Sequence, residues 1–421
     1  MRTKAVRMYG KKDLRLEEFE LPPIKDDEIL AHIVSDSLCM SSYKASIQGN
    51  EHKRVPKDIA EHPVIIGHEF CGEIVEVGKK WRSTFSAGMR FSIQPALNYQ
   101  GSLDAPGYSY RFIGGDATYI VIPREVMEMD CLLEYKGDAF FMGSLSEPMS
   151  CIVGAFHASY HLPDRSRYVH EMGIKPGGRM AILAGVGPMG LGAIDYAIHS
   201  DRKPSLLVVS DIDDARLARA GSIHTVQEAR GNGVQLRYVN TASMHDAPAE
   251  LLGLASGKGY DDVFVFAPVK TVVEQADRIL GQDGCLNFFA GPPDAQFSAL
   301  FNFYNVHYAG THVVGTSGGN TADMIESLAM MGDGRLNPAA MITHIGGLNA
   351  VPETTLNLPH IPGGKKLMYT NITMELTAIA EFDQKGNKDP LFAELARIVE
   401  RNNGLWCAEA ERYLLAHAKP I

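Results

Sequence analysis

The sequence predicts an α/β protein in which a β-rich domain is joined to a domain built on a doubly wound parallel sheet. Short apolar segments separated by turn residues fill residues 1–155, as in antiparallel β structure. From residue 180 onward such segments alternate with helical patterns, which is typical of βαβ units. A G-x-G-x-x-G loop, Gly185 to Gly190, stands where the first of these later strands passes into a helix.

The β-rich domain is expected to consist of short strands joined by turns. Gly67, Gly72 and Gly78 stand at strand ends, where glycine accepts backbone conformations that other residues avoid. Residues 95–115 are rich in Gly, Pro, Asn and Ser and are expected to form a long loop. The expected strands are residues 29–35, 64–66, 72–77 and 119–123.

The later part of the chain is expected to contain parallel strands and helices, followed by a helical tail. We expect residues 1–158 to form the first domain, 159–319 the second, and 320–421 a return to the first domain with a C-terminal extension. The expected strands are 180–184, 206–210, 262–267, 284–290 and 312–315, and the expected helices are 188–197, 214–220, 390–402 and 408–418.

The composition limits the classes of partner and compartment. The 421 residues carry a formal net charge of −10, which opposes binding to nucleic acid or to an anionic membrane surface. The N-terminal residues lack the apolar segment of a secretory signal, and the six cysteines show no pairing pattern. We therefore expect reduced thiols and a cytoplasmic location.

The glycine loop has the features of a dinucleotide-binding site. Gly185 would form the tight turn, Gly187 would leave room for the pyrophosphate, and Gly190 would let helix and strand pack closely. Asp211 ends the next strand and would accept hydrogen bonds from the adenosine ribose, which favours NAD(H) over NADP(H). Arg216 would contact the same ribose or soften that preference, so NADP(H) stays an alternative. A purely structural turn, with Asp211 capping the next helix, is the other interpretation.

Four residues have the chemistry and spacing of a catalytic zinc site. Such a site needs about three nitrogen, sulfur or oxygen ligands and one open position. The Cys39 thiolate, the His68 imidazole and one carboxylate, from Glu69 or Glu147, meet that requirement. An adjacent His-Glu pair in an extended strand points to opposite faces, although a turn at that place would relax this constraint.

Together these motifs resemble the zinc-containing medium-chain alcohol dehydrogenase family, from Met1 to about Tyr369. The resemblance implies a GroES-like β-barrel catalytic domain, an inserted Rossmann domain and one bound catalytic zinc. It implies that Cys39, His68 and a glutamate hold the metal and that Ser41 starts a proton relay. A zinc-bound water polarised by Glu147 is the alternative source of the proton. The matching motifs are Gly67-His68-Glu69 with Gly72 and Gly78, residues 114–123, Glu147-Pro148, the loop 185–190 and Gly364-Lys365.

Three departures from the family pattern refine this expectation. Residues 95–115 contain no cysteine, so the second, structural zinc of many relatives should be absent. Glu147 stands where alcohol dehydrogenases have a third cysteine, which resembles the polyol (sorbitol-type) branch. An insert at 161–170 and the tail after Tyr369 resemble the members that reduce ketose phosphates. This implies conversion of L-sorbose 1-phosphate to D-glucitol 6-phosphate.

A sugar phosphate requires positive charge near the metal. Lys44, Lys53 and Arg54 follow the ligand cysteine and would supply it, although such residues often form only a solvated surface. The alternatives are a polyol dehydrogenase acting on unphosphorylated sugars such as sorbitol and a non-catalytic dinucleotide-binding relative. The resemblance also implies a homo-oligomer, either a dimer or a tetramer.

Overall fold

A computed structural model describes residues 1–164, 166–292 and 294–421, which form two compact units. The first unit comprises Met1–Glu147, Asn320–Gly334 and Met341–Ile421, and the second comprises Pro148–Gly319 and Arg335–Ala340. The first division therefore falls inside helix α4 (Ser146–Ala158), earlier than the boundary expected after residue 158. One continuous helix contributes its start to the first unit and its remainder to the second, which an apolar pattern in the sequence does not reveal.

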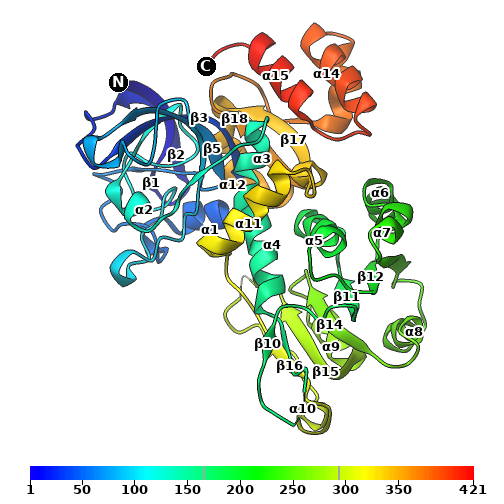
Figure 1. Cartoon of the computed structure of the whole chain (residues 1–421). Helices are drawn as coiled ribbons and strands as arrows, with labels where there is room; N and C mark the ends of the chain where they lie inside the picture. Colours follow the sequence, from blue (N-terminus) through cyan, green and yellow to red (C-terminus); the bar gives the residue numbers. More distant parts are fainter. Residues whose placement is uncertain (165, 293) are drawn as a thin grey trace. The chain divides into compact units, whose positions relative to one another are not determined.

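The first unit is organised around two β-sheets, some of whose strands are labelled in Figure 1. The larger sheet has the order β19-β17-β18-β3-β5-β6-β8 with β7 paired to β3, and the smaller has the order β2-β1-β4. All described pairs are antiparallel except β17 with β18. The strands are β1 (Arg2–Gly10), β2 (Asp13–Glu20), β3 (Ile29–Leu38), β4 (Val64–Ile65), β5 (Phe70–Val77), β6 (Arg90–Ile93), β7 (Tyr119–Ile122), β8 (Leu132–Glu134), β17 (Ile342–Gly347), β18 (Lys365–Tyr369) and β19 (Thr377–Ala378).

Short helices complete the first unit, and the long loop expected at 95–115 contains a single turn of 3₁₀ helix among its described elements. One core cluster packs Ile33, Phe70, Phe91 and Ile120 inside the strands, all at most 1% exposed. The helices are α1 (Met40–Gln48), α2 (Arg124–Glu128), α3 (Phe140–Ser144), α11 (Thr321–Gly332), α12 (Val351–Asn357), α13 (Phe382–Gly386), α14 (Pro390–Arg401) and α15 (Ala408–His417).

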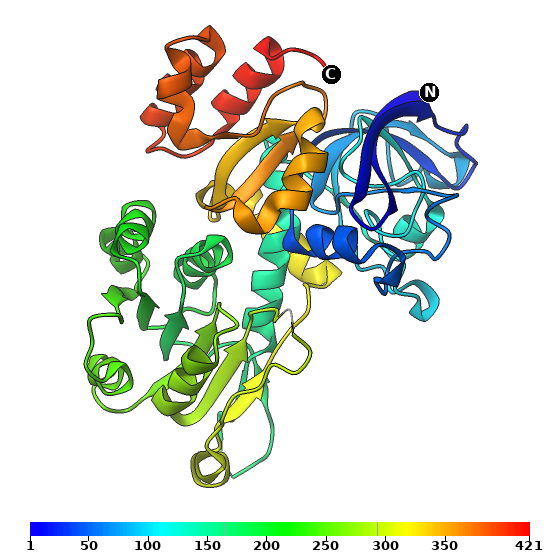
Figure 2. The ribbon, with the colours of Figure 1, turned by 180° about the vertical axis from the view of Figure 1, so that it is seen from behind.

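The second unit is a six-stranded parallel sheet with the order β13-β12-β11-β14-β15-β16, which confirms the doubly wound sheet. Its strands and helices can be followed from both sides in Figures 1 and 2. The strands are β11 (Arg179–Leu183), β12 (Leu206–Asp211), β13 (Gln235–Asn240), β14 (Tyr260–Val265), β15 (Leu280–Phe288) and β16 (His312–Val314). The helices are α5 (Pro188–His199), α6 (Asp214–Ile223), α7 (Val226–Gly231), α8 (Ala247–Leu254), α9 (Lys270–Ile279) and α10 (Phe303–Ala309).

A short hairpin of β9 (Tyr160–His161) and β10 (Glu171–Met172) brackets the insert expected at 161–170. Residue 165 of that insert lies outside the described residues. Among the described residues the six cysteines form no disulfide. No helix in the described parts of the chain combines the length and apolarity that crossing a membrane requires.

Candidate functional site

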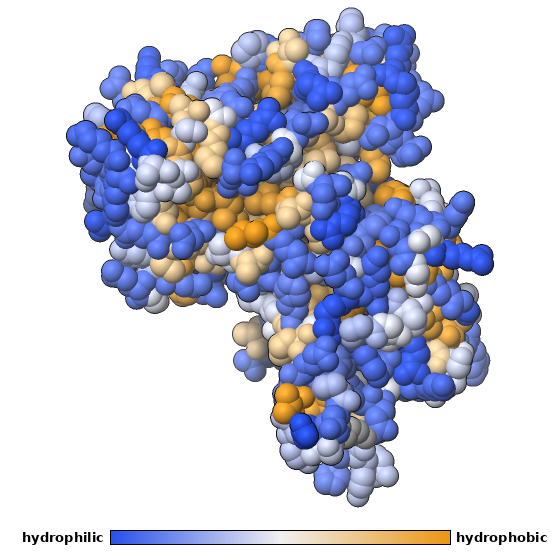
Figure 3. Space-filling model, in the orientation of Figure 1, coloured by the Kyte–Doolittle hydropathy of each residue, from blue (hydrophilic) through white to orange (hydrophobic). Residues whose placement is uncertain are grey.

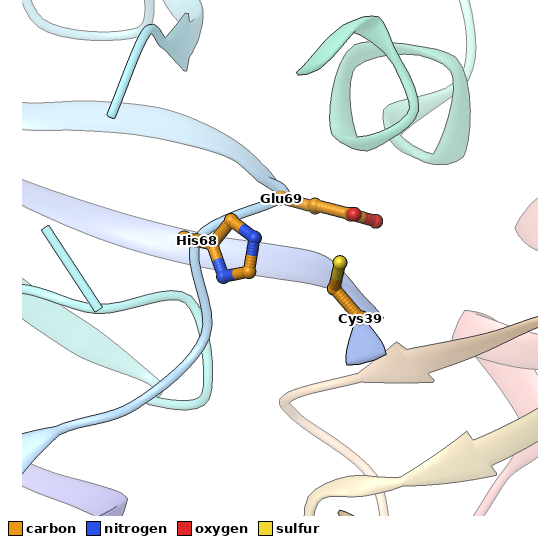
Figure 4. A group of neighbouring side chains, drawn as sticks. All are labelled: Cys39, His68 and Glu69. Atoms are coloured by element: carbon orange, nitrogen blue, oxygen red, sulfur yellow. The ribbon is translucent and has the colours of Figure 1, made fainter. Parts of the chain in front are cut away.

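Cys39, His68 and Glu69 form a group of metal-binding side chains in the first unit. Their ligand atoms all lie within 4.8 Å of one another, and Figure 4 shows the three side chains together. Cys39 follows β3 and precedes the first residue of α1, whereas His68 and Glu69 immediately precede β5. The ends of two paired strands of one sheet therefore bring a thiol, an imidazole and a carboxylate together.

The chain turns at His68 and Glu69, so the opposite-face rule for an extended strand does not apply. Gly67 has φ +90°, and Glu69 lies in a bend. A Cβ atom at Gly67 would lie 2.7 Å from the Asp116 backbone nitrogen, so the close approach also requires glycine. This local geometry lets both neighbouring side chains reach the metal group.

Glu69 is already paired with a cation. Lys365 Nζ, at the start of β18, donates to Glu69 Oε1 at 2.5 Å and Oε2 at 2.6 Å, and both side chains are buried. Burial opposes the charge of Lys365, but the Glu69 carboxylate raises the lysine pKa above its usual value. The negative charge of Glu69 is thus compensated without a metal ion.

Glu147 lies near the group, but the electrostatic environment of its carboxyl group differs from that of Glu69. It is half-buried in the first turn of α4, and its charge acts on His68 and Cys39. Burial, followed by the charge of Glu69, raises the pKa of Glu147 to about 7. Its anionic form is therefore the one that an added cation would stabilise most.

Serine hydroxyls fix the turn that precedes Glu147. Ser92 Oγ in β6 donates to the Gly143 carbonyl at 2.9 Å and lies 3.0 Å from Ser146 Oγ. Ser144 Oγ donates to the Ser35 carbonyl of β3 at 2.9 Å. The start of α4 is thereby held to the same sheet that carries Cys39.

Three hydroxyls surround the His68 ring. Ser42 Oγ lies 3.1 Å from Nδ1, whereas Ser41 Oγ and Tyr108 Oη lie 3.1 Å and 3.3 Å from Nε2. Ser41 Oγ also donates to Cys39 Sγ at 3.0 Å. If Ser42 accepts a hydrogen bond from Nδ1, Nε2 carries the lone pair that a metal ion needs.

The loop bearing Tyr108 reaches the site by a close backbone approach. A Cβ atom at Gly107 would lie 2.1 Å from the Gly67 carbonyl oxygen, and Gly107 has φ +78°. Tyr108 itself is 4% exposed, and its ring lies 4.9 Å from the ring of His68. The loop that lacks zinc-binding cysteines therefore contributes a hydroxyl to the site.

The donor set and its electrostatics suit a divalent metal of the zinc type. Burial and the Glu69 carboxylate raise the pKa of the Cys39 thiol, and burial lowers the pKa of His68. A dication would reverse the effect on the thiol, because it stabilises thiolate and carboxylate ligands. Thiolate, imidazole and carboxylate ligands are those of catalytic zinc sites.

Ser42→Ala tests the orientation of His68. We expect the substitution to lower zinc affinity by about 10- to 100-fold, the usual effect of losing the group that orients a histidine ligand. Competition with a colorimetric zinc chelator measures it. Ser46→Ala is the matched control, because Ser46 lies one turn later on α1 and its hydroxyl donates to the Ser42 carbonyl instead of contacting His68. Equal zinc affinity of Ser42→Ala and the unmodified protein would refute this role.

The three basic residues expected near the substrate differ in their positions. Lys53 is exposed and Lys44 is half-buried on α1. Arg54 is half-buried, with its guanidinium carbon 5.6 Å from the centroid of the Tyr108 ring. Burial raises the pKa of Tyr108 and lowers the pKa of His68, and the charge of Arg54 opposes the first shift and adds to the second. Within the described part of the chain no carboxylate pairs with Arg54. It is thus an uncompensated cation beside the metal group.

In the second unit, the glycine loop joins β11 to α5 as expected. Gly187 precedes the first helical residue, and a Cβ atom there would meet only Arg216 Nη2, at 3.6 Å, within 4 Å. A Cβ atom at Gly190 would lie 2.1 Å from the Gly185 carbonyl oxygen. Gly190 therefore serves packing, whereas Gly187 leaves open space at the helix N-terminus, where an anion is stabilised.

Asp211 ends β12, and its described hydrogen bond is from the backbone N–H of Ile212 at 2.8 Å. The cap of α6 is Asp213, which accepts from the Arg216 backbone N–H at 3.0 Å. Arg216 Nη2 lies 3.5 Å from the Val186 carbonyl in the glycine loop. The capping role considered for Asp211 thus belongs to its neighbour, and Arg216 lies close to the loop.

Sequence reasoning did not assign roles to Ser42, Tyr108 and Lys365. Ser42 directly follows Ser41 in the sequence, and its position there gives only a weak indication that it contacts His68. Lys365 lies 296 residues from Glu69 along the chain. Tyr108 lies in a loop without a motif, so only the fold reveals it.

Two family descriptions match the chain. Residues 25–130 match the alcohol dehydrogenase GroES-like domain, and residues 188–333 match the zinc-binding dehydrogenase domain. A mannitol-1-phosphate 5-dehydrogenase of Aliivibrio fischeri is 53% identical, covering 98% of this chain and 97% of its own. An L-sorbose 1-phosphate reductase of Klebsiella pneumoniae is also 53% identical, covering 100% of this chain and 98% of its own.

A solved structure supports the fold independently. A candidate zinc-binding dehydrogenase of Sinorhizobium meliloti 1021, bound to NADP, is 21% identical and superposes with a TM-score of 0.70. The match covers 88% of this chain and 100% of the other. The expected combination of a GroES-like domain with a Rossmann domain is thereby confirmed.

Proposed function

The chain belongs to the zinc-binding dehydrogenase family, whose members are oxidoreductases of alcohol groups, and we propose that it interconverts a ketose phosphate and a polyol phosphate. The proposed reaction is reduction of L-sorbose 1-phosphate to D-glucitol 6-phosphate with NADH, or NADPH as the alternative cofactor. The observation that supports it most is Arg54, an uncompensated cation beside a metal-binding group. Two relatives of over 50% identity, both named for sugar phosphates, agree with it.

We assign Cys39, His68 and Glu147 as the residues that would hold one zinc ion. Proximity alone favours Glu69 over Glu147, because Glu69 belongs to the group within 4.8 Å. Charge compensation favours Glu147, because Lys365 already neutralises Glu69 whereas the pKa of Glu147 is raised to about 7. We give charge the greater weight, since a dication gains most from the carboxylate whose pKa is raised by burial and by the neighbouring charge of Glu69.

The chain's own residues would orient the substrate and supply a proton. When bound, zinc would stabilise negative charge on the substrate oxygen and the reduced nicotinamide would supply a hydride. Ser41 Oγ, 3.0 Å from Cys39 Sγ and 3.1 Å from His68 Nε2, would donate the proton to that oxygen. Tyr108 Oη would hydrogen-bond the same region of the substrate.

Residues of the second unit would bind the cofactor. Gly187 would leave room for the pyrophosphate, in a loop whose turn and packing depend on Gly185 and Gly190, and Asp211 would accept hydrogen bonds from the adenosine ribose. The closeness of Arg216 to the loop supports a contact with the cofactor as well, which keeps NADP(H) as an alternative. A cytoplasmic location, compatible with cysteines that form no disulfide in the described part of the chain, completes the proposal.

A substrate panel tests the proposed function. The kcat/KM values for L-sorbose 1-phosphate, mannitol 1-phosphate, sorbose and sorbitol are compared with each cofactor, before and after zinc chelation. We expect turnover of a phosphorylated substrate, and its loss on chelation. Higher kcat/KM for free sugars would favour the polyol dehydrogenase alternative, and no turnover of any member would favour a non-catalytic relative.

Arg54→Gln is expected to raise KM for the phosphorylated substrate by about 10- to 100-fold, the range for losing a hydrogen bond to a charged group. The constants for an unphosphorylated substrate should change little. Lys53→Gln, an adjacent exposed cation, is the matched control. Steady-state kinetics on both substrates measures the difference, and an equal rise for both would contradict a phosphate contact.

We also propose a homo-oligomer formed through the second unit. Phe303 and Tyr304 of α10 are 76% and 68% exposed, and toward the lower end of the view in Figure 3 a small hydrophobic patch stands among residues of hydrophilic to intermediate hydropathy. The nearby β16 is an edge strand. The double substitution Phe303→Ser, Tyr304→Ser should lower the mass measured by sedimentation equilibrium. A monomeric unmodified protein would contradict the proposal.

A further inference from the structure

Glu411, in the C-terminal helix α15, is a buried acid that the proposed mechanism leaves without a role. It is 1% exposed. Its Oε1 accepts from the Phe140 backbone N–H at 2.7 Å, and its Oε2 accepts from the Phe141 backbone N–H at 2.9 Å. Oε2 also accepts from Tyr369 Oη at 2.8 Å. A carboxylate with three donors is a strong link between segments distant in sequence.

Both segments that Glu411 contacts lead to the metal group. Phe140 and Phe141 begin α3, which is followed almost directly by α4 and Glu147. Tyr369 ends β18, whose first residue, Lys365, pairs with Glu69. One side chain of the tail therefore touches β18, which carries the lysine that compensates Glu69, and α3, which lies directly before the helix that carries Glu147.

The tail is packed firmly enough to hold Glu411 in place. Trp406, 1% exposed, donates from Nε1 to Tyr369 Oη at 2.8 Å. The centroid of the Trp406 ring lies 6.3 Å from that of Phe382, which is also buried. Tyr369 thus receives one hydrogen bond and donates another, which fixes its hydroxyl beside the carboxylate.

Glu411 caps α3, which is too short to be a stable helix without contacts to the rest of the unit. α3 has five residues, and a helix of that length is unstable in isolation. Its first backbone N–H groups have no partner within the helix. Without Glu411, the Phe140 and Phe141 amides would be left unsatisfied in a buried place, and the approach to Glu147 would loosen.

We propose that Glu411 is a positioning residue that holds the start of α4 so that Glu147 reaches the metal. This inference rests on the proposed function in one respect, the assignment of Glu147 as a zinc ligand. The C-terminal tail is then part of the support of the metal site. The L-sorbose 1-phosphate reductase aligns over 100% of this chain, so the tail is shared with it.

Glu411→Gln, in the full-length zinc-loaded protein, tests the proposal. We expect zinc release to a chelator to accelerate about tenfold, within the range for groups that orient metal ligands, and kcat to fall with KM little changed. Glu409→Gln is the matched control, because Glu409 lies on the same helix and forms an exposed ion pair with Arg401. Unchanged zinc release in a folded Glu411→Gln protein, even with a lower thermal midpoint, would overturn the proposal.

A second variant covers the case in which Glu411→Gln does not fold. Tyr369→Phe removes one of the three donors and keeps both contacts to α3, so a smaller acceleration of zinc release is expected. Zinc release equal to that of the unmodified protein would then overturn the proposal. Zinc release is measured without substrate, so a failure of ketose phosphate turnover in the unmodified protein would count against the proposed function alone.

Discussion

Cys39→Ala is expected to abolish stoichiometric zinc binding and to lower kcat/KM by about 10³-fold. The substitution removes the only thiol of the group in which three ligand atoms lie within 4.8 Å. Two remaining ligands hold zinc poorly, and loss of the metal removes several kcal/mol of charge stabilisation in the transition state, each 1.36 kcal/mol being about tenfold in rate. Zinc per chain is measured by atomic emission, and kcat/KM is measured on the preferred substrate.

A second cysteine variant separates loss of the metal from loss of a buried sulfur. Cys131→Ala also shortens a buried side chain of the first unit, but Cys131 Sγ contacts Met129 and Thr321 instead of the metal group. It should retain one zinc per chain and most of the activity. A Cys39→Ala protein with full zinc content would show that the metal lies elsewhere.

Gly187→Val is expected to weaken NADH binding by about 100-fold, equivalent to about 2.7 kcal/mol, with little loss of stability. The new side chain would find open space in the protein itself, where only Arg216 lies within 4 Å of a Cβ atom. That space is the one a pyrophosphate would need at the N-terminus of α5. Fluorescence titration with NADH measures the dissociation constant, and a thermal melt measures the stability.

The control for this variant is Gly253→Val on α8, where a Cβ atom meets nothing within 4 Å. It carries the same change in the same unit, away from the loop, and should bind NADH normally. If both variants bind NADH as the unmodified protein does, the glycine loop is only a structural turn. The alternative interpretation of the sequence, in which the loop is a purely structural turn, would then hold in that respect.

The parallel sheet was predictable because its pattern is local. The apolar strands at 180–184 and 206–210 and the glycine loop between them lie within one βαβ unit, and the structure places β11 and β12 there. The hairpin of β1 and β2 was missed. β2 is rich in charge and has no fully buried residue, so it lacks the apolar pattern that marks a strand.

Only the residues of the candidate site that belong to sequence motifs could be predicted. Cys39, His68 and Glu69 were identified by residue type and are confirmed as neighbours. The choice between Glu69 and Glu147 depends on Lys365, which only the pairing of β18 with β3 brings to the site. Long-range pairing of this kind has no signature in a single sequence, and the role of Glu147 remains a prediction.

Two carboxylates in the turn between β12 and α6, Asp211 and Asp213, have different roles. Asp213 holds the N-terminus of α6, whereas Asp211 makes no described contact with the helix. The residue proposed to read the cofactor can therefore be exchanged without unwinding the helix that follows. Cofactor preference in this chain is thus an adjustable property, open to redesign for NADPH at position 211 while the fold is left as it stands.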